Sequence, residues 1–313
     1  DLSVYGTAIR AGRAEATVEW PKVQVGHAEL RLGEDLAVSA SGTVDVPSGG
    51  VSDLALRVAC NGAGLEAAGE ALLGERSVVR LDRMTCLLEG REAYHLTAPC
   101  QVSLGQGGVV GLDSMHLEGD GGAIRLAGTV AWPQQGQVQL NGQGVPLRDL
   151  EAWIRTPLPD VLVEDLVLNA SWNHGPASLV GTALAQWSRQ DGQSIPIRIE
   201  GSADGSGISL QRVSVMGPLA EAVTVHGHIP VTIVPAQWPR PWQALTGSPL
   251  RLEAVVGPDP AVTQELLEQT GIRMVHPDVR LTLSGSLAEP QGRIEAKASQ
   301  IDVRLSGELT GPR

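Results

Sequence analysis

The stretch LAVSASGTVDV, residues 36–46, decides the fold class. Apolar residues recur at every second position of this stretch, and Ser, Thr and Asp occupy most of the positions between them. Successive side chains of a β-strand point to opposite faces of a sheet, so the alternation predicts a strand with one apolar and one polar face. Strands of this kind belong to sheets of which only one face is buried.

The same alternation runs through residues 94–104 and residues 124–132. In the first of these, Tyr94, Leu96 and Val102 fall on one face while His95 and Thr97 fall on the other. The alternation continues without interruption to residue 104, so one long strand is expected there. The sequence therefore predicts an all-β protein.

A glycine motif recurs within these expected strands, with the order apolar, any, apolar, any, Gly, any, apolar. Its five copies place a glycine at Gly42, Gly128, Gly227, Gly285 and Gly307, always on the apolar face. A missing side chain at such a position allows a strand to bend or another group to approach closely. The copies are irregularly spaced, which excludes a strict short-period solenoid.

The composition favours a thin aliphatic layer over a compact globular core. Hydrophobic residues make up 42% of the 313 residues, but Phe is absent and only two Tyr occur. Aromatic side chains usually fill the centre of a compact core, because each buries a large area. With 38 Gly and 20 Pro, many turns between short strands are expected.

The charge and the cysteines exclude several functions. The net charge of −12 argues against nucleic acid and against docking of a polybasic patch on anionic lipid. Cys60, Cys86 and Cys100 lack the CxxC spacing of metal and thioredoxin-type sites. We expect them to be buried as small apolar residues, although one disulfide in an oxidising compartment stays an alternative.

No stretch approaches the roughly 20 apolar residues of a membrane-spanning helix. Asp1 begins within an ongoing pattern, so we expect the chain to be a segment of a longer protein, with any targeting or anchor sequence outside it.

Two segments depart from the β pattern and set the expected boundaries. Leu147, Leu150 and Ile154 recur at helical spacing, and a second short amphipathic helix is expected to end at Gly271. We therefore expect β-strands at residues 1–144, a helix within 145–156, strands at 157–256, a helix within 257–271 and strands at 272–313. The Pro-rich residues 230–249 are expected to form a loop or joint.

Residues that could carry chemistry form no recognisable site. His226 and His228 share one face of a strand, but this face is the polar one, and no third metal ligand is recognisable nearby. Residues 62–64 lack the third glycine of a dinucleotide loop, and residues 204–207 have the composition of a turn rather than of a nucleophile elbow. We therefore expect a protein that is not an enzyme and needs no cofactor.

The C-terminal stretch VRLTLSGSLAEPQGRIEA, residues 279–296, resembles the recurrent element of the TamB and AsmA-like superfamily. In that element a strand ending in apolar-x-Gly-x-Leu is followed by a Pro and by a second strand that Gly opens. The matching positions are Leu283, Gly285, Leu287, Pro290, Gly292 and Ile294. The resemblance is clearest over residues 120–310.

The resemblance implies an elongated, curled β-sheet that forms an open groove. It also implies a periplasmic bridge in a diderm bacterium, anchored in the inner membrane by a segment outside this chain, which carries phospholipids towards the outer membrane. A contribution to outer-membrane protein assembly and an outer-membrane β-barrel partner of the TamA type, contacted through regions outside this segment, are further implications.

An apolar sheet face cannot be left in water, because burial of each large aliphatic side chain is worth about 1.5–3 kcal/mol. It must close on itself, pack against a second layer or hold a lipid. We expect phospholipid acyl chains to contact aliphatic residues of the groove, namely Val38, Val44, Val58, Leu96, Val102, Leu126, Val130, Val225, Ile229, Leu281, Leu283 and Leu305.

Three alternatives stay open at the level of sequence. A structural or adhesive β-solenoid would fill its apolar face with its own side chains. A carbohydrate-active β-helix would place carboxylates beside Trp in an outer cleft. A chaperone would use the sheet edge to accept strands of unfolded outer-membrane proteins.

Overall fold

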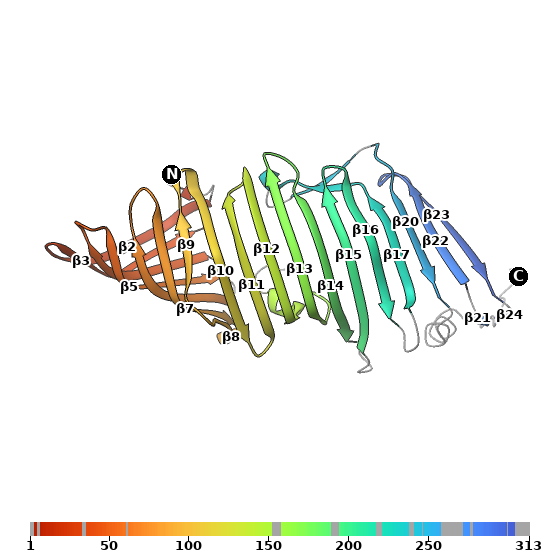
Figure 1. Cartoon of the computed structure of the whole chain (residues 1–313), viewed down its shortest axis with the longest axis horizontal. Coiled ribbons are helices and arrows are strands. Elements are labelled where there is room, and N and C mark those ends of the chain that lie inside the picture. The colour runs from red at the N-terminus through yellow and green to blue at the C-terminus, as the bar shows by residue number, and fades with distance from the viewer. Residues whose placement is uncertain are drawn as a thin grey trace, which may run out of the picture. The chain divides into compact units, whose positions relative to one another are not determined.

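The computed structural model describes residues 3–4, 7–32, 36–60, 62–151, 158–188, 194–216, 221–237, 241–245, 247–257, 272–275, 278–298 and 300–303. These residues are nearly all in antiparallel β-strands, which confirms the expected all-β class (Figure 1). The chain divides into two units, residues Asp1–His174 and Gly175–Arg313. The boundary lies within the range 157–256, where the sequence indicated no division.

The first unit is an antiparallel sheet in which most strands pair with their neighbours in the sequence. In Figure 1 the strand direction turns steadily from β3 to β12, so this sheet is strongly twisted. Its strands are β1 (Ser3–Val4), β2 (Thr7–Glu19), β3 (Lys22–Leu32), β4 (Leu36–Asp45), β5 (Gly50–Cys60), β6 (Ala63–Leu72), β7 (Ser77–Leu88), β8 (Arg91–Leu96), β9 (Cys100–Leu104), β10 (Val109–Gly119), β11 (Gly122–Ala131), β12 (Gln135–Pro146) and β13 (Val161–Asn173).

The second unit is a sheet in the order β14-β15-β16-β17-β20-β22-β23. These strands are β14 (Ser178–Ser188), β15 (Ser194–Asp204), β16 (Gly207–Met216), β17 (Glu221–Ile229), β20 (Arg251–Val256), β22 (Asp278–Gly285) and β23 (Pro290–Lys297). Two small sheets accompany it, one of β18 (Val231–Ile233) with β19 (Trp242–Ala244) and one of β21 (Ile272–Val275) with β24 (Gln300–Val303). The Pro-rich segment therefore contains a short pair of strands in addition to its turns.

The expected single strand over residues 94–104 is wrong. The chain forms β8 and β9, which are separated by residues 97–99 and together occupy the place of one strand between β7 and β10. Pro99 explains the break, because proline has no N–H to donate to a neighbouring strand.

Two glycines of the recurring motif lie where the backbone of the neighbouring strand approaches closely. A Cβ atom at Gly128 would lie 2.3 Å from the carbonyl oxygen of Gln137, and one at Gly227 would lie 2.1 Å from that of Arg251. Both glycines have positive φ, 157° and 147°, and residues with a side chain rarely adopt such values. The group that approaches each glycine is therefore the neighbouring strand, while Gly307 lies outside the described residues.

A buried apolar cluster lies in the first unit, on strands β6 to β10 and β12. Tyr94 and Met84 are each only 5% exposed. The other members of the cluster are Ala67, Leu81, Cys100, Leu117 and Val145. This part of the apolar face is filled by the protein's own side chains.

The described part of the first expected helix is a 3-10 turn, η2 (Leu147–Leu150), followed by Glu151 in α-helical conformation. Two further 3-10 turns are η1 (Gln106–Gly108) and η3 (Pro235–Gln237). The second expected helix, over residues 257–271, lies outside the described residues apart from Gly257.

Candidate functional site

Three apolar rows cross the sheet of the second unit from β14 to β23. Directly paired residues of antiparallel strands lie on the same face, so each row is fixed by the strand register. The first row is Ala183, Ile199, Val213, Val225, Ala254, Leu281 and Ile294. The second is Ala185, Ile197, Val215, Val223, Val256, Val279 and Ala296, and the third is Gly181, Gly201, Leu210, Gly227, Leu252, Leu283 and Gly292.

These rows are accessible. Only Ala185 is buried among their residues, all of which the structure describes. Ile294 is 72% exposed, Ile199 is 38% exposed and Leu281 is 37% exposed. The second unit therefore presents an aliphatic surface to which another apolar molecule has access.

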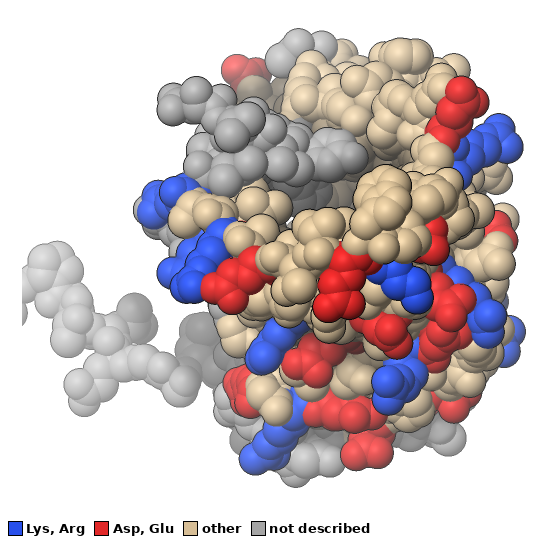
Figure 2. Space-filling view, turned by 90° about the vertical axis from the view of Figure 1, so that its left-hand side faces the viewer, with Lys and Arg blue, Asp and Glu red and all other residues tan. Residues whose placement is uncertain are grey.

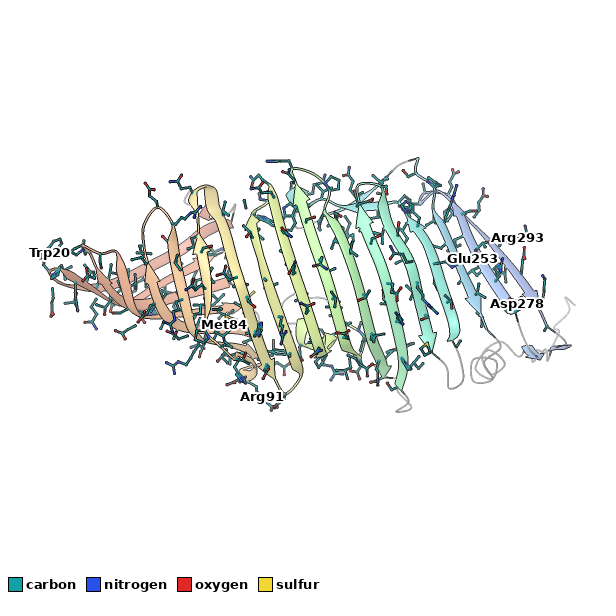
Figure 3. All side chains as sticks on the ribbon, viewed as in Figure 1. Trp20, Met84, Arg91, Glu253, Asp278 and Arg293 are labelled. Atoms are coloured by element: carbon teal, nitrogen blue, oxygen red, sulfur yellow. The ribbon has the colours of Figure 1, made fainter. Side chains whose placement is uncertain are left out.

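The opposite face of the second unit carries ion pairs. Glu253 on β20 lies between Arg280, whose Nε is 3.1 Å from Oε1, and His226, whose Nε2 is 3.6 Å from Oε2. On the edge strand β23, Arg293 pairs with Glu295 at 2.8 Å. Figure 3 labels Glu253 and Arg293 on this unit. The alternation seen in the sequence thus corresponds to one aliphatic and one charged face.

The first unit has a longer apolar row, from β3 to β13. Its members are Val23, Val44, Val51, Ala71, Val79, Val102, Leu112, Gly128, Val138 and Ala170. None of these ten residues is buried, and all are partly exposed. Seen from the β2–β3 end, positive and negative side chains intermingle over the lower part of the surface, while uncharged residues form much of the upper part (Figure 2).

The register assigns the residues expected at the site to these rows. Val44 and Val102 share the long row of the first unit, Val38 pairs with Val58, and Leu96 pairs with Leu117. Leu126 pairs with Met115 and Leu140, and Val130 with Val110. In the second unit Val225 and Leu281 share the first row, Leu283 lies in the third and Ile229 pairs with Ile208. Leu305 lies outside the described residues.

The two units differ in how far their apolar faces are filled. In the first unit Leu96 and Val102 pack against the buried cluster around Tyr94 and Met84. In the second unit the described rows show no comparable cluster of buried large side chains. The rows of the second unit are therefore the stronger candidate for ligand contact.

Tyr94 has a polar partner within the cluster. Its hydroxyl donates a hydrogen bond of 2.9 Å to Oδ2 of Asp149, which lies in η2. Burial and this hydrogen bond to a carboxylate both raise the pKa of Tyr94. No periodicity in the sequence indicates this contact, because the partners are 55 residues apart.

None of the three cysteines forms a disulfide in the structure. Of the three, Cys100 is buried as expected, whereas Cys60 and Cys86 are only partly buried, and Cys86 packs against the cluster. Burial raises the pKa of the Cys86 and Cys100 thiols.

Comparison of the chain with protein-family models, with curated proteins and with solved structures gave no match.

The two histidines singled out in the sequence occupy the polar face of the second unit. Besides the His226 contact with Glu253, Nδ1 of His228 lies 3.4 Å from Oγ of Ser209. Across the described part of the chain, no three His, Cys, Asp or Glu side chains gather as a metal site would require. No helix within the described residues is long and apolar enough to span a membrane.

Sequence reasoning missed several residues of the rows, among them Ile199, Val213 and Ala254. The alternation of Ile195, Ile197 and Ile199 was a readable signal. Val213 follows a register shift between β16 and β17, which no sequence pattern indicates.

Proposed function

We propose that this protein binds phospholipid acyl chains along its apolar sheet faces and carries them passively. The observation that supports this proposal is the exposed aliphatic surface of the second unit. Ile294, Leu281 and Ile199 remain accessible on one continuous row across seven strands. Contact with hydrocarbon would remove that surface from water, which is favourable in proportion to the area buried.

The dimensions of the row agree with such a ligand. Seven strands about 4.8 Å apart extend over about 29 Å. The hydrocarbon core of a bilayer is about 30 Å thick and holds two opposed acyl chains. A row of the second unit therefore offers aliphatic contacts along roughly the length of two acyl chains.

Carriage of this kind needs a continuous apolar lining and no catalytic group. The proposal is accordingly a non-enzymatic role, without cofactor, in a periplasmic bridge anchored in the inner membrane by sequence outside this chain. Its support is the resemblance of residues 279–296 to the recurrent TamB and AsmA-like element. Assistance to outer-membrane protein assembly, through a β-barrel partner of the TamA type, belongs to the same proposal.

Native mass spectrometry after mild extraction tests this function. The wild-type chain is expected to carry phospholipid, and Ile294→Asp is expected to reduce the bound fraction because it places a charge on the apolar row. Gln291→Asp is the matched control, since it adds the same charge to the same exposed strand on the opposite face. A wild-type chain that never carries phospholipid would contradict the proposal.

A second candidate is a structural or adhesive scaffold. The buried cluster around Tyr94 and Met84 favours it, because in that region the apolar face is occupied by the protein itself. A ligand-free wild-type chain with unchanged thermal stability after lipid extraction is the result that this candidate predicts.

A further inference from the structure

Five turns of the first unit lie at the same end of its strands. They connect β2 to β3, β4 to β5, β6 to β7, β9 to β10 and β11 to β12, and the alternation of the strands places all five on the same side. The described turns at Glu89 and Gly90 and at Asp120 and Gly121 lie at the opposite ends of the strands. In Figure 3 Trp20 lies at the tip of the β2–β3 hairpin, and Arg91 lies by the β7–β8 turn, at the other end of the strands.

Exposed large apolar side chains concentrate at the strand ends where these five turns lie. Of the ten that the structure describes in this unit, seven are at or next to the five turns. They are Val18, Trp20, Val46, Leu72, Leu73, Leu104 and Trp132, which we call the apolar rim. Trp20 is 75% exposed, more than any other described large apolar residue.

The opposite ends of the strands expose mainly charged side chains. Their exposed side chains include Glu89, Arg91, Glu92, Asp120, Arg148 and Asp160, and Leu162 is the one exposed large apolar residue described near their turns. The described residues at the two ends of the strands thus differ: one end exposes large apolar side chains and the other exposes charged ones. Near the second set of turns Tyr94, Leu117 and Val145 are buried in the apolar cluster, whereas the large apolar side chains at the five turns remain exposed.

Neighbouring turns of the apolar rim are tied together. The backbone N–H of Val46 donates to the carbonyl oxygen of Pro21 at 3.0 Å, and that of Leu73 donates to Gly49 at 2.8 Å. At the other end of the rim, Trp132 packs edge to face against Trp172, with ring centroids 6.1 Å apart. The exposed side chains are therefore presented by connected turns.

We propose that the apolar rim docks this unit on the surface of a lipid bilayer, with its side chains in the interfacial region. Trp suits this depth because its ring is apolar and its N–H is polar. The polar backbone of turns is tolerated at the interface, where water is available, and not in the hydrocarbon core. The apolar rim extends over eight strand spacings, from β2 to β11, or about 38 Å.

The charge of the turns fits a bilayer of zwitterionic lipid. The described charged residues at the five turns are Glu19, Lys22, Asp45, Glu75 and Arg76, which sum to −1, whereas the whole chain carries −12. Electrostatic repulsion from lipid headgroups is therefore weak at the five turns, and docking does not require attraction to anionic lipid. The inference goes beyond acyl-chain carriage, because it concerns side chains at the turns.

Flotation of the full chain with phosphatidylcholine vesicles tests this docking. The wild type is expected to float with the vesicles. Combined Trp20→Ala and Leu73→Ser is expected to weaken binding about ten-fold or more, because two exposed apolar side chains are lost. Arg91→Ala with Leu162→Ser at the opposite ends of the strands is the matched control and is expected to bind as the wild type does. All of these side chains are exposed, so the variants should retain the wild-type melting temperature.

Failure of the wild type to float, or equal binding by the rim variant, would overturn the proposal. Sedimentation velocity supplies a second readout: self-association that the rim variant abolishes would assign the apolar rim to a protein interface and would also overturn it. Native mass spectrometry of the same rim variant separates docking from carriage. If the rim variant no longer floats but still carries phospholipid, the apolar rim is a docking surface distinct from the carrying face. If the wild type floats but carries no phospholipid, the result contradicts carriage and leaves docking supported.

Discussion

The hydroxyl of Tyr94 on β8 donates a 2.9 Å hydrogen bond to the carboxylate of Asp149 in η2. A Cβ atom at Gly121, in the turn between β10 and β11, would lie 2.9 Å from this hydroxyl and 3.0 Å from Oδ2 of Asp149. Three segments far apart in the sequence therefore meet at one hydrogen bond. It fixes the 3-10 turn against the buried cluster of the first unit.

Tyr94→Phe is expected to lower the free energy of unfolding by about 1.5–3 kcal/mol, because a partly buried hydrogen bond to a charged group is lost. Denaturant unfolding measures the change. In an Asp149→Ala background the same substitution should cost much less, because the partner is already missing. An equal cost in both backgrounds would mean that the loss comes from packing and not from this bond.

Tyr94 should stay protonated at a pH where a free tyrosine ionises, because burial and Asp149 raise its pKa above the ordinary value of 10.0. The raised pKa of the folded state means that the stability it contributes is present below pH 10 and is lost as the pH rises above it. Absorbance of the phenolate, measured in a Tyr5→Phe background, follows this titration. Ionisation near pH 10 in a chain that is still folded would contradict the assignment.

The thiols of Cys86 and Cys100 should react slowly with iodoacetamide at pH 8. Burial raises the pKa of both groups, so the reactive thiolate is scarcer than in a free thiol. A Cys60→Ser background isolates these two thiols, and their labelling should accelerate as the pH rises. The urea-unfolded chain is the control and should label at the rate of a free thiol; equal rates in the folded chain would argue against burial.

Gly227→Ala should destabilise the second unit by about 1–3 kcal/mol, because its backbone conformation is unfavourable for a side chain. The added Cβ would also meet the carbonyl oxygen of Arg251 at 2.1 Å. Gly205→Ala is the control, since its nearest contact would be 3.8 Å away and its φ is not positive. Thermal unfolding of both variants measures the difference, and similar melting temperatures would contradict the close approach.

Alternation in the sequence was sufficient to assign the all-β class and the faces of many strands. It placed Val44 and Val102 on the apolar side, and both lie in one row of the first unit. It missed the break between β8 and β9 at residues 97–99, because the apolar alternation continues across Pro99, although this proline is a local signal against one continuous strand. Helical spacing at Leu147 and Leu150 was read correctly as a departure from strand, and the described residues form a 3-10 turn followed by Glu151 in α-helical conformation.

The candidate site was accessible to sequence reasoning only in part. Leu281 and Leu283 could be read as apolar from their strand, whereas the meeting of Leu281 with Ala254 and Ile294 depends on register. Exposure was not predictable either, since alternation indicates a face but not whether another layer covers it. The Tyr94 and Asp149 contact lies beyond any local pattern for the same reason.

Photo-crosslinking tests acyl-chain contact most directly. A p-benzoylphenylalanine at Ile294 should form adducts with the mass of a phospholipid when the chain is irradiated with phosphatidylcholine vesicles. The same probe at Gln291, equally on β23 but facing the polar side, should give at least about ten-fold fewer adducts, because the aliphatic rows lie on the other face. Equal yields at the two positions, or no lipid adduct at Ile294, would contradict the account.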